Sequence, residues 1–185
     1  ESRIAIVGAN GVGKSTLLKL LVGKLNLSSG NSYRNGRLNL SMFTQHHIDQ
    51  LKLPLSPLTV HARFSRLDCI DYRGHLGSFG ITGNLALRPN YLLSGGQKSR
   101  VAFALAMWKN PHILVLDEPT NHLDIDAVNA LIVALNNYNG GVIIVSHDQH
   151  LVSTAVNKFG NKGHKIKEIA GDFEDYRRML ALGKL

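Results

Sequence analysis

The residues from Gly8 to Ser15 are the first stretch whose types and spacing could carry out chemistry. They fit the pattern G-x-x-x-x-G-K-[ST] and lie between an apolar run and a helical pattern. In such a loop, glycines let backbone N–H groups converge on phosphate oxygens, and the following helix presents its positive end. The residues expected to bind nucleotide phosphates are Gly8, Ala9, Asn10, Gly11, Val12, Gly13, Lys14, Ser15 and Thr16.

Lys14 and Ser15 have separate expected roles in this loop. The ammonium group of Lys14 should reach the β- and γ-phosphates, and the hydroxyl of Ser15 should bind Mg²⁺. The alternative is a glycine-rich turn between a strand and a helix, in which the lysine is incidental. The strand and helix patterns on either side favour the phosphate-binding interpretation.

Two carboxylates, Asp117 and Glu118, directly follow the apolar run 113–116. Charge at the end of a buried strand is unfavourable unless a cation meets it. With Mg²⁺ beside Ser15, Asp117 is expected to hold the metal, and Glu118 is expected to polarise the attacking water as the catalytic base. The alternative is a strand end whose carboxylates are simply solvated.

A histidine, His147, follows the next apolar run, 142–145. Ligand sites in open α/β sheets lie at the carboxyl ends of the strands, so neighbouring parallel strands would bring His147 to the same edge as Asp117. There it could contact the γ-phosphate and sense its loss. Taken alone, a histidine after a strand is more often a surface residue or a helix start.

A second phosphate-type motif, residues 93–97 with the sequence LSGGQ, opens the helical pattern 97–109. A serine and two glycines at the positive end of a helix predict another anion site, here formed by Ser94, Gly95, Gly96 and Gln97. Two such surfaces on one domain favour pairing, in which each surface completes the partner's site.

The elements that must position these residues follow from the apolar pattern. Short runs rich in Ile and Val at 4–7, 113–116 and 142–145 are typical of strands buried on both faces of a parallel sheet. Helical spacing appears between them, at 14–22, 97–109 and 126–136. This alternation predicts an α/β domain with a mostly parallel sheet flanked by helices, and the phosphate-binding motif adds the expectation of a P-loop NTPase fold.

The segment 46–96 breaks this alternation, because it contains three prolines and only short helical stretches at 59–67 and 71–79. We therefore expect one nucleotide-binding domain over 1–185, with a helical subdomain at about 46–109 inserted in its core. Further expected elements are a turn at Asn35-Gly36 leading into a strand, a helix near 148–156, a hairpin at 158–167 and a helix at 173–182.

Composition excludes several classes of protein. With 44% hydrophobic and 18% charged residues, the 185-residue chain fits a globular domain and not a disordered one. No apolar run approaches the about 20 residues of a membrane helix, and the start lacks the layout of a signal peptide. The single cysteine, Cys69, favours a reducing compartment. The net charge of +8 permits an acidic partner without naming it.

Taken together, these motifs resemble the ATP-binding-cassette (ABC) ATPases and occur in the family's order. The resemblance implies that LSGGQ is the signature motif, which closes over ATP held by the P-loop of the opposing domain. It also implies that Gln45 is the Q-loop residue near Mg²⁺, that Asp117 and Glu118 are Walker B and catalytic base, and that His147 is the switch histidine. Residues 121–124 match the D-loop.

Three stretches, 2–8, 117–124 and 171–176, look like the ABC-F group. Two more, 45–51 and 93–104, are similar to the second, carboxy-terminal cassette of eukaryotic members tied to translation and the general-control stress response. Those proteins are soluble and carry two cassettes in one chain. The resemblance implies ATP and Mg²⁺ as cofactors, and a second cassette in the same chain or a homodimer. It further implies the ribosome and its rRNA as partners, no membrane insertion and a cytoplasmic location.

Two features of the family pattern do not appear. Family cassettes begin with a small antiparallel β region whose aromatic residue stacks on adenine, whereas this sequence reaches the P-loop at Gly8. The linker between the two cassettes does not appear either. We therefore expect an amino-terminally truncated cassette with weak or no ATPase activity in isolation.

Three other functions are compatible with the motifs. The chain could be the nucleotide-binding domain of an ABC membrane transporter. It could belong to a repair or chromosome-structuring ATPase, although the short stretch between Gln45 and Leu93 leaves no room for the long coiled coils of that class. It could also bind ATP without turning it over.

Overall fold

A computed structural model of the chain describes residues 2–44, 51, 54–61, 66–108, 110–121, 123–155, 158–162, 166–169 and 173–182. The chain divides into two compact units. The first comprises Glu1–Thr44, Pro111–Thr120 and Asn139–Leu185, and the second comprises Gln45–Asn110 and Asn121–Tyr138. The second unit therefore takes in 121–138 in addition to the helical insertion expected at about 46–109.

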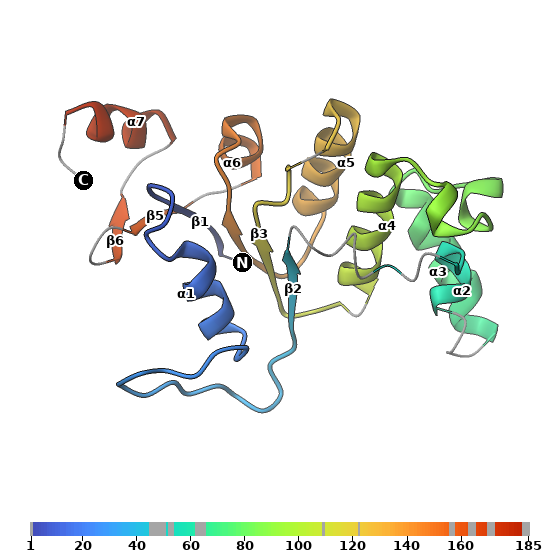
Figure 1. The fold of residues 1–185 in the computed structure, drawn as a ribbon, viewed down its shortest axis with the longest axis horizontal. Coiled ribbons are helices and arrows are strands. Elements are labelled where there is room, and N and C mark those ends of the chain that lie inside the picture. The colour runs from blue at the N-terminus through green and yellow to red at the C-terminus, as the bar shows by residue number, and fades with distance from the viewer. Residues whose placement is uncertain are drawn as a thin grey trace. The chain divides into compact units, whose positions relative to one another are not determined.

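The first unit is built on a six-stranded sheet with the strand order β2-β3-β4-β1-β5-β6 (Figure 1). All neighbouring strands run parallel except β5 and β6, which form an antiparallel pair. The strands are β1 (Arg3–Val7), β2 (Leu40–Thr44), β3 (Ile113–Asp117), β4 (Gly141–Val145), β5 (Lys158–Lys162) and β6 (Ile166–Ile169). The α/β class with a mostly parallel sheet is thus confirmed.

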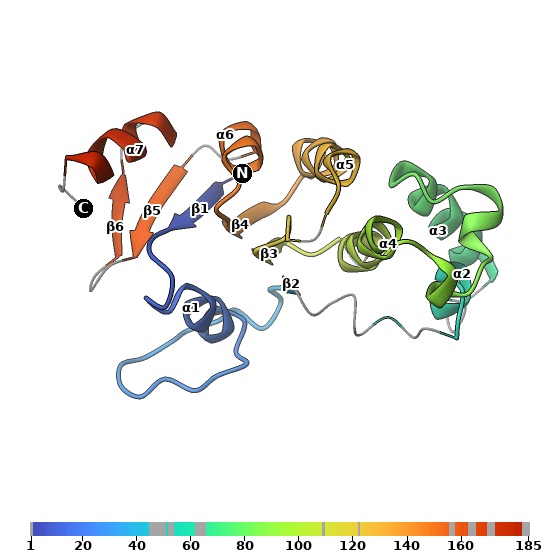
Figure 2. The same cartoon turned by 45° about the horizontal axis from the view of Figure 1, so that its top comes forward.

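Helices cover both faces of this sheet within the first unit (Figure 2). Helix α1 (Lys14–Leu21) lies on one face, where the buried Leu18 packs with Ile6, Met42, Val115 and Val145. Helices α6 (Gln149–Ala155) and α7 (Phe173–Ala181) lie on the other face. There Val152 and Tyr176 form a buried cluster with Ala5 and Val7 of β1. Successive residues of β1 serve opposite faces because side chains alternate along a strand.

The second unit is helical. It contains α2 (Pro57–His61), α3 (Arg66–Ser78), the short 3₁₀ helices η2 (Gly83–Ala86) and η3 (Asn90–Leu92), α4 (Gly95–Trp108) and α5 (Ile125–Asn136). Its core includes an aromatic cluster in which the buried Tyr72 packs edge-on against Trp108, with ring centroids 5.0 Å apart. His75 joins this cluster, and its ring nitrogen Nε2 lies 2.9 Å from the carbonyl oxygen of Ala104.

Most of the expected elements are present with small shifts at their ends. The strands expected at 4–7, 113–116 and 142–145 are β1, β3 and β4, and the helices expected at 14–22, 97–109 and 126–136 are α1, α4 and α5. The turn at Asn35-Gly36 is closed by a hydrogen bond from Leu38 N to Asn35 O and precedes β2. The hairpin is β5–β6, and the helices expected near 148–156 and at 173–182 are α6 and α7.

The helices expected at 59–67 and 71–79 were misplaced. The first helix, α2, comprises Pro57–His61, and the second, α3, comprises Arg66–Ser78. The earlier start of α2 has a local cause: Ser56 Oγ accepts a hydrogen bond from Thr59 N at 3.2 Å, and proline suits the first turn of a helix. Residues 62–65 lie outside the described part of the chain.

The amino-terminal turns of α4 and α5 meet at Gly96. A Cβ atom added to Gly96 would lie 2.7 Å from Asp124 Oδ2, which is closer than side chains pack. Asp124 is held in place because its Oδ1 accepts a hydrogen bond from Ala127 N at 2.7 Å, capping α5, and lies 3.8 Å from Arg100 Nη2. Glycine at position 96 therefore lets the two helix starts approach.

Because of this close approach, Gly96→Ala should destabilise the protein when Asp124 is present and stabilise it when Asp124 is replaced by alanine. Gly96→Ala should lower the free energy of unfolding by about 1 kcal/mol, because the new methyl group displaces the carboxylate that caps α5. In an Asp124→Ala background the same change should raise it by about 0.5 kcal/mol or more, since alanine favours helix over glycine. Urea denaturation followed by circular dichroism measures both values.

The neighbouring Gly95→Ala serves as the matched control, since its added Cβ would meet no atom within 4 Å beyond its chain neighbours and the backbone of its own helix. It should be neutral or stabilising in both backgrounds. Equal effects of Gly96→Ala with and without Asp124 would show that the contact does not constrain position 96.

Candidate functional site

The loop between β1 and α1 has the backbone shape that a phosphate-binding loop needs. Gly11 and Gly13 adopt positive φ angles of 81° and 90°, a region that residues with a side chain rarely enter. Gly13 is also the N-cap of α1, so the helix begins directly at the loop. The first N–H groups of a helix have no partner within it and are available to an anion.

Lys14 folds back over this loop. Its side chain is buried, with 8% of the residue exposed, and its ammonium group donates hydrogen bonds to the carbonyl oxygens of Gly8 at 2.8 Å and Ala9 at 2.9 Å. A buried ammonium group is favourable only when such partners satisfy it. The cation is thus fixed at the centre of the loop.

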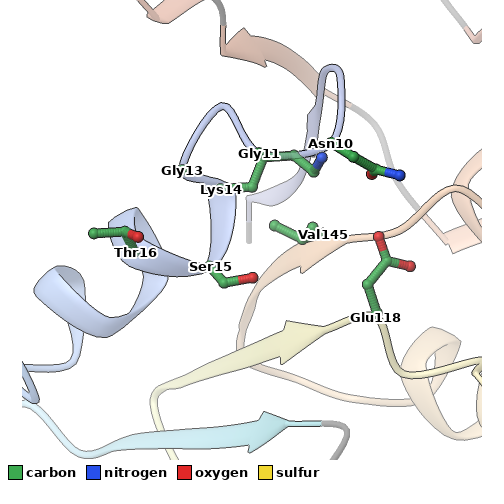
Figure 3. A pocket seen from close by; sticks show the side chains of 8 residues that line it. All are labelled: Asn10, Gly11, Gly13, Lys14, Ser15, Thr16, Glu118 and Val145. Atoms are coloured by element: carbon green, nitrogen blue, oxygen red, sulfur yellow. The ribbon is translucent and has the colours of Figure 1, made fainter.

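A pocket of about 310 Å³ lies against the loop (Figure 3). Its lining residues come from three places: the loop with the start of α1, the end of β3 and the end of β4. They are Asn10, Gly11, Gly13, Lys14, Ser15, Thr16, Glu118 and Val145. Six of the nine residues expected to bind phosphates therefore line one pocket.

The first carboxylate after β3 meets the loop directly. Ser15 Oγ donates a hydrogen bond to Asp117 Oδ1 at 2.9 Å, although the two residues are 102 positions apart. Asp117 is buried, with 9% exposed, in the last position of β3. Hydroxyl and carboxylate oxygens are hard ligands of the kind Mg²⁺ prefers, so this pair fits the expected metal.

Among the described residues, no three His, Cys, Asp or Glu side chains gather into a metal-binding cluster. A magnesium ion bound through one or two protein oxygens and the phosphates of a nucleotide does not require such a cluster. Gln45, the other expected ligand, lies outside the described part of the chain.

Glu118 occupies a strained backbone position at the edge of the pocket. Its φ angle is 48°, which is uncommon for a residue with a side chain, and its N–H donates to Val145 O at 2.8 Å. Burial raises the pKa of its carboxyl above the usual value, and the nearby Asp117 adds to this. His147 and Lys14 lower the pKa in turn. A carboxylate with a raised pKa is a better proton acceptor, and strain of this kind accumulates at functional sites.

His147 lies beside Glu118. Its ring nitrogen Nε2 is 3.4 Å from Glu118 Oε1 and 3.0 Å from Asn10 Oδ1. The turn that places it is fixed by its neighbours, since Asp148 N donates to Ser146 Oγ at 3.0 Å and Asp148 Oδ1 accepts from Leu151 N to start α6. The contact with Asn10 is one that the sequence patterns did not indicate.

The signature-motif residues belong to the second unit. Ser94 and Gln97 bind each other reciprocally: Ser94 N donates to Gln97 Oε1 at 3.0 Å, and Gln97 N donates to Ser94 Oγ at 3.2 Å. This is a capping box, which fixes the first turn of α4. Gly95 and Gly96 are the first two residues of α4, so both lie within this turn.

One residue near these motifs, Arg100, was missed, and so was the packing of the D-loop residue Asp124. Arg100 approaches Asp124, and Asp124 lies against Gly96. The spacing of the signature motif from the D-loop residues could not indicate this contact, since it depends on how α4 and α5 pack. His122, within the expected D-loop, lies outside the described part of the chain.

Comparison with known proteins gives a consistent result. The family model described as "ABC transporter" matches residues 1–121. The chain is 50% identical over 97% of its length to "ABC transporter F family member 3" of Arabidopsis thaliana, and 49% identical over 96% to "Protein GCN20" of Saccharomyces cerevisiae. It is 46% identical over 97% to human "ATP-binding cassette sub-family F member 3". It spans 24–26% of the length of these relatives, about a quarter.

Solved structures agree on the fold. The chain superposes with a TM-score of 0.78 on an inward-facing conformation of a putative metal-chelate type ABC transporter, at 24% identity, covering 100% of this chain and 77% of the other. It superposes with a TM-score of 0.73 on cbiO1 from Clostridium perfringens, part of the ABC transporter complex cbiONQ, at 25% identity, covering 99% of this chain and 80% of the other. These likenesses confirm the expected P-loop NTPase fold.

Within the described part of the chain, no helix is both long and apolar enough to cross a bilayer. The family model covers well over half of the sequence, and the Arabidopsis and human relatives, at 50% and 46% identity, carry names of the F subfamily. The expected resemblance is thereby confirmed, and the chain belongs to the ABC transporter family.

Proposed function

We propose that this chain is a cassette that binds MgATP and hydrolyses it to ADP and phosphate when paired with a second cassette. One observation carries the proposal: the groups that such chemistry needs meet at one pocket. Lys14, Ser15 and Glu118 line it, Asp117 contacts Ser15, and His147 contacts Glu118. These groups come from three separate segments of the chain, which an incidental glycine-rich turn would not bring together.

Binding would rest on the loop and on Lys14. The backbone N–H groups at the start of α1 and the Lys14 ammonium group would bind the phosphate oxygens, and Ser15, Asp117 and Gln45 would hold Mg²⁺. When bound, the magnesium ion neutralises charge that develops on the phosphates. The protein contributes positioning and preorganised charge, which are the main sources of catalysis in phosphoryl transfer.

Glu118 would act on the attacking water, and His147 would brace the γ-phosphate. Glu118 is suited to this role because its carboxylate lies at the pocket wall and burial raises its pKa. His147 is suited because its ring nitrogen Nε2 lies 3.4 Å from Glu118 Oε1, at the same edge of the sheet. Water activation and phosphate contact would then occur side by side.

The signature residues Ser94, Gly95, Gly96 and Gln97 would complete the site of a partner cassette. Their capping box presents the positive end of a 14-residue helix, α4, which attracts anions. In this arrangement each of two cassettes supplies one half of each site. The second cassette would belong to the same parent chain or to a second copy.

We further propose that the parent protein is a soluble ABC-F protein, with this chain as its carboxy-terminal cassette, acting in translation on the ribosome in the cytoplasm. The support is the 46–50% identity to F-subfamily relatives along nearly the whole chain, against 24–25% for the transporter structures. A net charge of +8 suits contact with rRNA.

The first prediction concerns the base. In the intact parent protein, Glu118→Gln keeps the size of the side chain but removes the proton acceptor, so ATP hydrolysis should fall about 100-fold or more. ATP binding, which rests on the loop and Lys14, should persist. Phosphate release and the binding of a fluorescent ATP analogue measure the two effects. Turnover equal to that of the unchanged parent protein would remove Glu118 from this role.

The second prediction concerns pairing. Specific ATPase activity should be very low in a dilute, strictly monomeric sample and should rise with protein concentration, because each site needs groups from two cassettes. Mixing Lys14→Ala chains with Gly95→Asp chains should recover activity that neither has alone, since the mixed pair keeps one intact site. Gly95 suits this test because the space beside it is open. Robust activity in the monomer would contradict the composite site.

The third prediction concerns the partner. The protein that carries this cassette should sediment with ribosomes from a cell extract, and raising the salt concentration should release it, since contacts with phosphates weaken as salt increases. Sucrose-gradient fractions probed with an antibody measure this. Recovery in a membrane fraction that only detergent dissolves would instead support the transporter alternative.

A further inference from the structure

Asn10 belongs to the loop that is expected to bind phosphates, but the motif assigns no role to its side chain. The motif binds phosphates through backbone N–H groups, Lys14 and Ser15, so it leaves the side chain at position 10 free to vary. In the structure this side chain makes a contact with a residue 137 positions away. The contact ties the loop after β1 to the turn after β4.

The contact centres on one nitrogen atom. His147 Nε2 lies 3.0 Å from Asn10 Oδ1 and 3.4 Å from Glu118 Oε1. Asn10 and Glu118 both line the pocket and lie at the same end of it, away from Thr16 (Figure 3). One ring nitrogen therefore links the loops that follow β1, β3 and β4.

The chemistry of the three groups decides which atom carries the proton. The Glu118 carboxylate lies 3.4 Å from His147 Nε2, and a negative charge at this distance favours a proton on that nitrogen. With Nε2 as donor, the facing atom of the Asn10 amide must be its oxygen and not its nitrogen. The carboxylate thus favours the amide orientation that the structure has, with Oδ1 facing Nε2.

We propose that Asn10 is a positioning residue for His147: its amide oxygen holds the Nε2–H group at the pocket end where Glu118 lies. The His147 side chain is 54% exposed, so without this acceptor its ring would be free to turn towards solvent. The inference rests on the proposed function, in which His147 contacts the γ-phosphate. A ring already held in place loses less conformational freedom when that contact forms.

This role makes Asn10 matter for ATP but not for ADP. ADP lacks the γ-phosphate, and the groups that bind its phosphates are the loop amides, Lys14 and Ser15. Loss of the Asn10 amide should therefore weaken the binding of a triphosphate and leave the binding of a diphosphate unchanged. A direct contact of Asn10 with the shared phosphates would affect both nucleotides equally.

The first arm of the test needs no nucleotide. Carbon-13 relaxation of the His147 ring, assigned by its loss in His147→Gln, should show a more mobile ring in Asn10→Ala. Asn10→Asp keeps an acceptor oxygen of the same shape and should retain the ordered ring. An equally ordered ring in Asn10→Ala would overturn the proposal, as would a ring that Asn10→Asp releases to the same extent.

The second arm measures binding of the magnesium complexes of ADP and of a non-hydrolysable β,γ-imido ATP by calorimetry. Asn10→Ala should weaken the imido-ATP complex about threefold to tenfold, the size of one net hydrogen bond, with ADP unchanged. In a His147→Gln background the same substitution should have no further effect. Additive losses, equal losses for both nucleotides or unchanged imido-ATP binding would each overturn the proposal.

The two arms separate this inference from the proposed function. If the unchanged chain binds neither nucleotide, the proposed nucleotide binding fails, and so does the proposed benefit of Asn10 for ATP. The relaxation data still decide whether Asn10 holds the His147 ring. If the chain binds both nucleotides and the ring is unaffected by Asn10→Ala, only the inference about Asn10 fails.

Discussion

The position of β4 between β1 and β3 is the constraint on which the rest of the site depends. Val145, the last residue of β4, pairs with Ile6 of β1 on one side and Asp117 of β3 on the other. Because all three strands run parallel, their following loops open at one edge of the sheet. A shift of one residue in either ladder would turn side chains to the opposite face and take Asp117 away from Ser15.

Charge at this edge is tolerated because each group has a partner close by. Lys14 is bound to the carbonyl oxygens of Gly8 and Ala9, Asp117 to the Ser15 hydroxyl, and Glu118 lies near His147. A single buried charge without such a partner would be strongly unfavourable. The surroundings also shift pKa values. Burial raises the pKa of the Glu118 carboxyl, and the nearby His147 and Lys14 lower it in part. The hydrogen bonds and close contacts of these charged groups therefore support both the stability of the site and the proposed chemistry.

Local patterns predicted the parts of this arrangement that depend on neighbouring residues. The apolar runs of β1, β3 and β4 and the glycine-rich loop can be identified from spacing, since period and turn chemistry are local properties. The start of α2 was missed although its cause, Ser56 before Pro57, is also local. The contacts of Asn10 with His147 and of Gly96 with Asp124 could not be predicted, because they depend on how distant segments pack. Sequence spacing indicated the candidate site residues, and the tertiary structure shows which of them contact each other.

The hydrogen bonds of the phosphate-binding loop and of the signature motif also affect how tightly a phosphate can be bound. The Lys14 ammonium group already donates to two carbonyl oxygens, and the His147 ring contacts Asn10, so an incoming anion that takes over these donors exchanges one hydrogen bond for another. The Ser94 hydroxyl differs, because it accepts from Gln97 N and keeps its own proton to donate. An exchange of this kind contributes only about 0.5–1.5 kcal/mol per bond. Strong binding must then come from many such exchanges made together with the unpaired amides at a helix start and a bound cation. A half site, which offers only some of these groups, would hold a nucleotide weakly, and two cassettes that supply both halves would hold it firmly.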